Sequence, residues 1–190
     1  MTEIVLFHHV QGLTPGVVGF ADRLREAGHT VHTPDLFEGR TFDSIDEGMA
    51  HARELGDETD TRADRAVADL PEGVVYAGMS FGAMPAQRFA QQRPGARGAV
   101  LLHGCADPKW FGGWPSGVPA QIHAMDADPF FTEEGGDLEG AQVLVRAADD
   151  AEIFLYPGDE HLFTDSTLAA YDEAATDQVV ERVLGFLDTH

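Results

Sequence analysis

The stretch VVYAGMSFGAMPAQRFA, residues 74–90, joins an apolar run to Gly-Met-Ser-Phe-Gly and then to a segment with the spacing of a helix. The apolar run predicts a buried strand. A strand that turns sharply into a helix strains the backbone at the turn and leaves no room for a Cβ on either side. Gly78 and Gly82 meet that demand around Ser80. The spacing therefore predicts a Ser80 hydroxyl displayed at the end of a strand, with a helix N-terminus directed at it.

Short apolar runs alternate with amphipathic segments along the whole chain. Strands are expected at residues 4–7, 30–34, 73–77, 97–104, 119–126 and 150–158, and helices at residues 13–29, 42–70 (one or two), 81–92, 137–148 and 166–188. Parallel strands need crossover helices, and strands that are apolar on both faces are covered on both sides. Residues 1–190 are therefore expected to form a single doubly wound α/β domain, with a mostly parallel sheet of about six strands and no cap domain.

The composition excludes several classes of partner. The formal net charge is -21, with 12 Lys+Arg against 33 Asp+Glu. Such a surface repels nucleic acid and anionic membrane surfaces. The simplest explanation of the acidity is solubility, and adaptation to high salt is the alternative. The N-terminus lacks the pattern of a secretory signal, and no stretch is apolar enough to cross a bilayer, so a cytoplasmic protein is expected.

Cysteine usage argues against disulfides and cysteine-based metal clusters. The chain has one cysteine, Cys105. One thiol forms no internal bridge and no multi-cysteine cluster. The adjacent His8 and His9 are poorly arranged to chelate one ion. We therefore expect neither a metal nor another cofactor.

A serine nucleophile needs a general base and an acid that orients it. On a sheet of this kind the chain order is serine, acid, histidine. His161 lies in YPGDEHLFTD, between the last predicted strand and the last predicted helix, where it can reach back over the sheet edge. His103 and His123 fall in predicted strands and are expected to be core residues. The order therefore predicts His161 as the base for Ser80.

The acid is expected after the fifth strand, where IHAMDADPFF offers Asp126 and Asp128. Asp128 lies in the loop and is favoured, whereas Asp126 is expected at the strand end and stays an alternative. An oxyanion hole needs two backbone donors. We expect these to be the N–H groups of Phe81, just after the serine, and of Val10, in the loop after the first strand. His9 is expected to face the same site.

Aromatic residues gather in the loops at the predicted carboxyl edge of the sheet. Trp110 and Phe130 are candidates for an apolar substrate wall, together with Phe111, Trp114 and Phe131. Apolar walls with a few polar groups are typical of small-molecule sites. Packing of these loops on the core is an equally good explanation of the aromatic residues.

These motifs resemble those of the dienelactone hydrolase family of α/β-hydrolases. The resemblance runs over nearly the whole chain and rests on FHHVQG, HTPDLFEGR, GMSFGA, MDADPFF and GDEHLF. It implies a catalytic triad of Ser80, Asp128 and His161 with oxyanion donors Phe81 and Val10, and it favours Asp128 over Asp126.

Three departures separate this sequence from the family's namesakes. They use a cysteine nucleophile where this chain has Ser80, and they carry a glutamate in the first loop where it has His9. The arginine that holds the substrate carboxylate, four residues after the histidine, is replaced by Asp165. A negative charge there is expected to repel an anionic lactone. The resemblance therefore implies hydrolase chemistry more strongly than it implies dienelactone as substrate.

The sequence thus predicts a serine hydrolase of small esters or lactones that works through an acyl-enzyme. Two other functions stay open. One is a non-catalytic binding protein with this fold, and the other is a hydrolase of thioesters or peptide-like bonds that uses the same residues.

Overall fold

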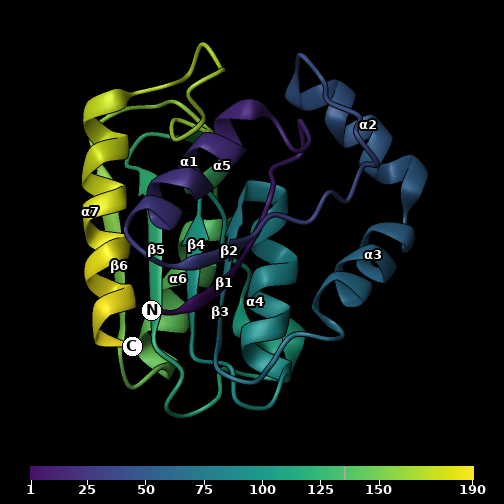
Figure 1. Cartoon of the computed structure of the whole chain (residues 1–190). Helices are drawn as coiled ribbons and strands as arrows, with labels where there is room; N and C mark the ends of the chain where they lie inside the picture. The colour runs from purple at the N-terminus through teal and green to yellow at the C-terminus, as the bar shows by residue number, and fades with distance from the viewer. Residues whose placement is uncertain (135) are drawn as a thin grey trace.

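The computed structural model describes residues 1–134 and 136–190. Six strands form one parallel sheet with the order β2-β1-β3-β4-β5-β6. The strands are β1 (Glu3–Phe7), β2 (Thr30–His32), β3 (Val74–Met79), β4 (Gly98–Leu102), β5 (Ala120–Met125) and β6 (Ala151–Tyr156). Helices cover both faces of this sheet (Figure 1). The predicted doubly wound α/β architecture is confirmed.

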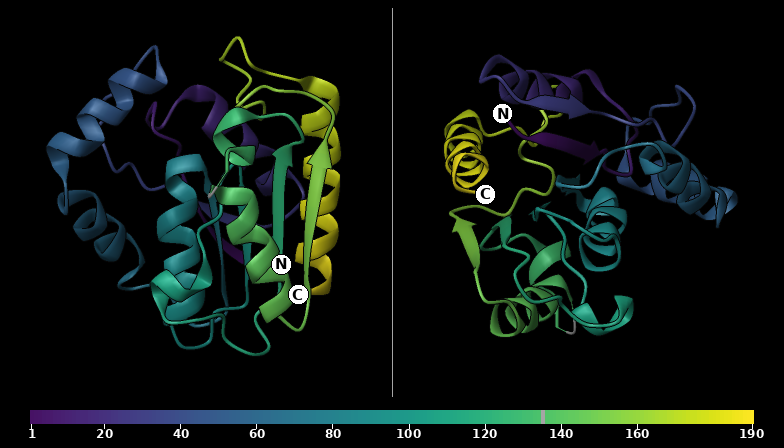
Figure 2. Two further views of the ribbon diagram at one scale, coloured as in Figure 1. Left: turned by 180° about the vertical axis from the view of Figure 1, so that it is seen from behind. Right: turned by 60° about the horizontal axis from the view of Figure 1, so that its bottom comes forward.

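Two apolar layers hold the helices against the sheet. The helices are α1 (Pro15–Glu26), α2 (Ile45–Leu55), α3 (Glu58–Val67), α4 (Ala83–Gln92), α5 (Pro129–Thr132), α6 (Asp137–Ala147) and α7 (Glu173–Thr189), with 3-10 turns η1 (Ser80–Gly82) and η2 (Pro108–Phe111). Helices α1 and α7 pack on one face with Ile4 and Leu6 of β1. Helices α3, α4 and α6 pack on the other face with Val5 and Phe7. Figure 2 shows α4 and α6 on the opposite side of the sheet from α1 and α7. Because successive strand residues point to opposite faces, β1 is buried on both sides.

Local sequence signals place the first helix where it was expected. The Thr14 hydroxyl accepts the N–H of Val17, and Pro15 occupies the first helical position. Gly28 follows the helix with a φ of 95°, a conformation that favours glycine. An N-cap, a first-turn proline and a glycine stop thus bound α1 as the sequence predicts.

The last helix begins later than predicted. Helix α7 starts at Glu173 and not near Ser166, because the side chain of Asp172 caps it by accepting the N–H of Ala175. The residues before it form turns, in which the N–H of Leu168 donates to the Asp165 carbonyl. The segment between β6 and α7 is therefore a long loop over the sheet edge.

The predicted helical region 42–70 forms two helices. Gly56, with a φ of 51°, ends α2 and separates it from α3. The expected helix from Phe81 opens with the 3-10 turn η1 before α4 begins. None of the described helices is long and apolar enough to cross a membrane.

The carboxyl ends of the strands meet at one edge of the sheet because all six strands are parallel. Ser80 follows β3, His103 follows β4, Asp128 follows β5 and His161 follows β6. The loop after β1 reaches the same edge with His9. Ligands of open α/β sheets bind at this edge, so it is the place to look for a functional site.

Candidate active site

Ser80 stands on a strained turn between β3 and α4. Its φ of 50° lies in the left-handed region that side chains rarely adopt. A Cβ on Gly78 would overlap the carbonyl oxygen of Gly82, and a Cβ on Gly82 would lie 2.6 Å from the carbonyl oxygen of His8. The two glycines therefore let the backbone close tightly around the serine, as the spacing predicted.

A continuous chain of hydrogen bonds starts at the Ser80 hydroxyl. Ser80 Oγ lies 2.8 Å from His161 Nε2, and His161 Nδ1 lies 2.6 Å from Asp128 Oδ2. The carboxylate can only accept, so Nδ1 carries the proton and Nε2 is left to accept from the hydroxyl. This arrangement of serine, histidine and carboxylate allows the serine to lose its proton to the imidazole.

Asp128 is the carboxylate that the structure brings to the histidine. It is fully buried, and its Oδ1 accepts the N–H of Phe130 at 2.9 Å, so both oxygens are occupied. The competing Asp126 is exposed and accepts the N–H of Gly158 at 3.1 Å. Proline at position 129 begins α5, and Asp128 caps this helix, which turns its other oxygen toward His161.

The predicted oxyanion donors lie on two backbones that pack together. The close approach of Gly82 to the His8 carbonyl brings the turn after Ser80 against the loop that carries Val10. Phe81 is in the first turn of a helix, where N–H groups have no partner from the same helix. The N–H of Val10 donates to no acceptor in the described part of the chain. Both groups are thus available to a ligand oxygen.

A cavity of about 380 Å³ opens beside His161. The Phe130 ring, 55% exposed, lies with its centroid 4.7 Å from that of His161. The cavity is lined by Gln11, Asp43, Ser44, Ile45, Pro129, Phe130, Asp159, Glu160, His161, Leu162, Leu168, Ala169 and Ala170. The sequence analysis did not predict the lining residues at the start of α2 and in the turns before α7. These segments are far apart along the chain, and only folding brings them to the cavity.

Two predicted substrate contacts lie elsewhere. Trp110 is 67% exposed on η2 and lines a separate hollow with Lys109 and Gly140. The side chain of Asp107 caps η2 by accepting the N–H of Lys109, which turns this segment toward α6. His9 is fully buried and bonded to Asp165, so its ring does not line the cavity.

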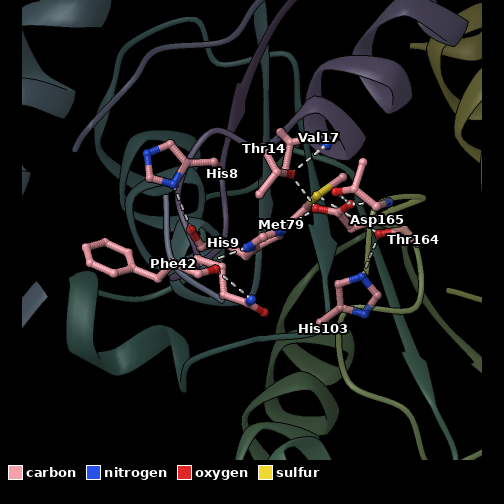
Figure 3. Close-up of polar contacts among 11 residues, drawn as sticks. His8, His9, Thr14, Val17, Phe42, Met79, His103, Thr164 and Asp165 are labelled. Atoms are coloured by element: carbon pink, nitrogen blue, oxygen red, sulfur yellow. Dashed lines mark hydrogen bonds and ion pairs between the residues drawn. The ribbon is translucent and has the colours of Figure 1, made fainter. Parts of the chain in front are cut away.

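Asp165 also corrects an expectation. Its side chain is fully buried under the loops, where it accepts hydrogen bonds from His9 and from the hydroxyl of Thr14 (Figure 3). Its charge is therefore used inside the protein and does not face the cavity beside His161. The position of Asp165 therefore does not support the predicted repulsion of anionic substrates by this residue.

The remaining histidines at this edge are core residues, as predicted. Burial lowers the pKa of His123 to about 3, and that of His103 falls well below its usual range for the same reason. His103 Nε2 lies 2.8 Å from Thr164 Oγ1 (Figure 3). The His103 ring centroid lies 5.8 Å from that of His161. Both rings are neutral at physiological pH, and His103 packs against the loop that carries His161.

The described residues contain no group of three or more His, Cys, Asp and Glu side chains placed to hold a metal ion. Cys105 is buried, and burial raises the pKa of its thiol far above the usual range. A thiol held in the neutral form is a poor nucleophile. Among the residues at this edge, the activated hydroxyl of Ser80 is therefore the better candidate for attack.

Comparison with known proteins gives a family. The sequence model of the dienelactone hydrolase family matches residues 1–190. No curated protein sequence matches the chain.

Several solved structures resemble the chain closely in fold and weakly in sequence. A dienelactone hydrolase-like promiscuous phosphotriesterase from metagenomic libraries has a TM-score of 0.76 and 17% identity, over 100% of this chain and 86% of that one. A putative dienelactone hydrolase from Klebsiella pneumoniae has a TM-score of 0.72 and 18% identity, over 100% and 88%. A putative hydrolase of the α/β superfamily from Xanthomonas campestris has a TM-score of 0.60 and 22% identity, over 97% and 99%. These likenesses establish the α/β-hydrolase fold.

The family match covers the whole chain, and the fold agrees with it. The chain therefore belongs to the dienelactone hydrolase family and is a hydrolase that acts on ester bonds.

Proposed function

We propose that this hydrolase cleaves small carboxylic esters or lactones with Ser80 as nucleophile, His161 as general base and Asp128 as the orienting acid. The observation that carries the proposal is the unbroken chain of 2.8 and 2.6 Å contacts from the serine hydroxyl to a buried carboxylate. All six strands belong to one sheet, which supports treating residues 1–190 as a single domain.

The proposed reaction has two halves. Ser80 Oγ attacks the ester carbonyl while His161 Nε2 takes the proton of the Ser80 hydroxyl. The oxyanion that forms accepts hydrogen bonds from the N–H groups of Phe81 and Val10. The tetrahedral intermediate expels the alcohol, which takes the proton from His161. Water then attacks the acyl-enzyme by the same steps and releases the acid. Asp128 stays charged and stabilises the imidazolium in both halves.

The charge of the cavity suggests the class of ester. Asp43, Asp159 and Glu160 line its wall, and none of its lining residues is Lys or Arg. Carboxylates at an opening repel anions and attract cations, and low salt strengthens both effects. We therefore assign neutral or cationic esters as substrates in preference to anionic ones. Acidic residues at the rim, rather than Asp165, provide this selection.

The test of the nucleophile uses p-nitrophenyl acetate and butyrate with wild type, Ser80→Ala and Ser116→Ala. Ser116 is an exposed serine hydrogen-bonded to Asp149 and serves as the matched control. We expect turnover by wild type and Ser116→Ala and at least a 1,000-fold loss in Ser80→Ala, by order of magnitude. Equal turnover by all three would refute the assignment.

A fluorophosphonate probe separates the enzyme from a binding protein with this fold. Labelling at Ser80, located by mass spectrometry and absent from Ser80→Ala, supports the proposal. Folded wild type that takes up no label and turns over no ester would favour binding. An acyl thioester run beside its oxygen ester under the same conditions shows which bond is preferred.

A further inference from the structure

A second histidine and carboxylate pair lies beneath the sheet edge, away from the cavity. His9 Nε2 is 2.7 Å from Asp165 Oδ2, and both side chains are fully buried, with 0% of their surface exposed. His9 belongs to the loop after β1, and Asp165 belongs to the loop after β6 (Figure 3). The proposed reaction uses neither side chain, so the pair needs another explanation.

The Asp165 carboxylate is held by donors on all sides. Oδ2 accepts from His9 and from the hydroxyl of Thr14, and Oδ1 accepts the N–H and the hydroxyl of Thr167 at 2.8 and 2.6 Å. A Cβ on Gly16 would overlap Oδ1, so the first turn of α1 rests directly on the carboxylate. Burial by itself would raise the pKa of Asp165, but these hydrogen bonds outweigh it and lower the pKa to about 2. The carboxylate is therefore charged and fixed in place.

The ring of His9 connects this carboxylate to the backbone around Val10. The N–H of Gln11 donates to His9 Nδ1 at 3.2 Å, so Nδ1 is unprotonated. Nε2 therefore carries the proton and donates a hydrogen bond to Asp165. The carbonyl oxygen of His9 accepts the N–H of Gly12 at 3.0 Å. Hydrogen bonds thus hold His9 and Gln11, the residues on both sides of Val10, in place. The N–H of Val10 itself has no acceptor among the described residues.

We propose that Asp165 is a positioning residue that acts through His9 to fix the direction of the Val10 N–H, the second donor to the oxyanion. The inference rests on the proposed function. His161 lies four residues before Asp165 on the same loop, so one buried carboxylate sets the relation between the base and the donor. A donor that moves by about 1 Å loses much of its effect on the transition state and little of its effect on ground-state binding.

The variants are Asp165→Asn, Thr14→Val and Thr14→Ser, with Thr2→Val as control. Asparagine has the size of aspartate but cannot accept from all four donors, and valine removes the hydroxyl that Thr14 donates. Thr2 is buried and its hydroxyl donates to the Leu187 carbonyl at 3.2 Å, before β1 at the opposite end of the sheet. With a p-nitrophenyl ester we expect kcat to fall about 10- to 100-fold in Asp165→Asn, with KM changed less than about threefold. Thr14→Val should show a smaller fall, Thr14→Ser should retain most activity, and Thr2→Val should match wild type.

A thiono ester isolates the donor from the base. Sulfur accepts hydrogen bonds weakly, so a thiono ester gains little from the oxyanion donors, whereas it needs the base as much as its oxygen analogue does. If Asp165 positions Val10, the ratio of kcat for the oxygen ester to kcat for its thiono analogue falls in Asp165→Asn. An unchanged ratio with both rates reduced would overturn the proposal in favour of an effect on His161.

Other outcomes also decide the question. A lower melting temperature with wild-type kcat at 20 °C would reduce Asp165 to a stabilising residue and overturn the proposal. If Asp165→Asn does not fold, the same ratio measured in Thr14→Val decides. Wild type that turns over no ester removes the proposed function and this inference with it, whereas active wild type with an unaffected ratio removes the inference alone.

Discussion

Replacing Asp128 by asparagine tests the proposed acid, because both of its oxygens accept hydrogen bonds. Oδ1 accepts the N–H of Phe130 and Oδ2 accepts Nδ1 of His161. Asparagine has one oxygen, and the backbone N–H cannot adapt, so the amide oxygen stays with Phe130 and the amide nitrogen faces the histidine. His161 must then carry its proton on Nε2, where it points at Ser80 and cannot accept.

A histidine base held in the wrong tautomer lowers kcat by a large and characteristic factor. We expect kcat for p-nitrophenyl butyrate to fall about 10⁴-fold in Asp128→Asn, which corresponds to about 5 kcal/mol of transition-state stabilisation. The melting temperature should change little, since asparagine is also a good N-cap for α5. The effect should therefore appear in kcat and not in the amount of folded protein measured by circular dichroism.

Asp126→Asn is the matched control, two residues away on the same loop. Asp126 is exposed and accepts only the N–H of Gly158 among the described residues, so its loss should change kcat less than about threefold. The reasoning fails if folded Asp128→Asn keeps more than a tenth of the wild-type kcat. It also fails if Asp126→Asn loses as much activity as Asp128→Asn, which would make Asp126 the acid.

Three other predictions concern the turn, the cavity and the buried histidines. Gly82→Ala should lower the free energy of unfolding by about 2 kcal/mol or more, because its Cβ overlaps backbone oxygens at the end of β1. Gly19→Ala, whose nearest neighbour would be 4.0 Å away, should be neutral or slightly stabilising in the same urea titration, and a similar loss in both would be contrary evidence. Phe130→Ala should raise KM for butyrate esters about three- to tenfold through lost apolar contact, with labelling of Ser80 retained; an unchanged KM would place the acyl chain elsewhere. Burial lowers the pKa of His8 to about 4, so between about pH 6.5 and 4 the unfolded chain binds a proton that the folded chain refuses. His8 alone should therefore lower the free energy of unfolding by about 3 kcal/mol as the pH drops through that range, and His103 and His123, whose pKa values burial also lowers, should add to the fall. A flat urea midpoint between pH 7 and 5 would refute this prediction.

The order of elements and the strand-end residues could be predicted from the sequence because both follow from local patterns and one topological rule. Alternating strands and helices impose a parallel sheet, and a parallel sheet brings its strand ends together. That rule is enough to gather Ser80, Asp128 and His161 from segments far apart along the chain. It needs no knowledge of how the loops pack.

The roles of Asp165 and Trp110 could not be predicted in this way. Asp165 was expected to face the substrate because its position was compared with a residue that does so in relatives. Its direction is set by four donors from the loops after β1 and β6, which no local pattern encodes. Trp110 was placed at the site because it follows a strand, but the cap at Asp107 turns its segment away. The direction of side chains in loops, beyond the first turn after a strand, therefore could not be predicted from the sequence.

The two pairs of histidine and carboxylate at this edge have nearly the same contact distance, although they use different ring nitrogens. His161 lies 2.6 Å from Asp128, and His9 lies 2.7 Å from Asp165. In each pair the carboxylate is fully buried and accepts a hydrogen bond from a protonated ring nitrogen. The pair by itself therefore does not distinguish a base from a structural contact.

The partner of the other ring nitrogen makes the difference. Nε2 of His161 faces the hydroxyl of Ser80, whose proton is transferable once the oxygen attacks a carbonyl. Nδ1 of His9 faces the N–H of Gln11, an amide that does not give up its proton under these conditions. An imidazole is thus placed to act as a base where a partly buried alcohol faces it, and as a rigid link where a peptide N–H faces it. A search for catalytic histidines in related chains should therefore begin with the group opposite the carboxylate, and the ring's own burial comes second.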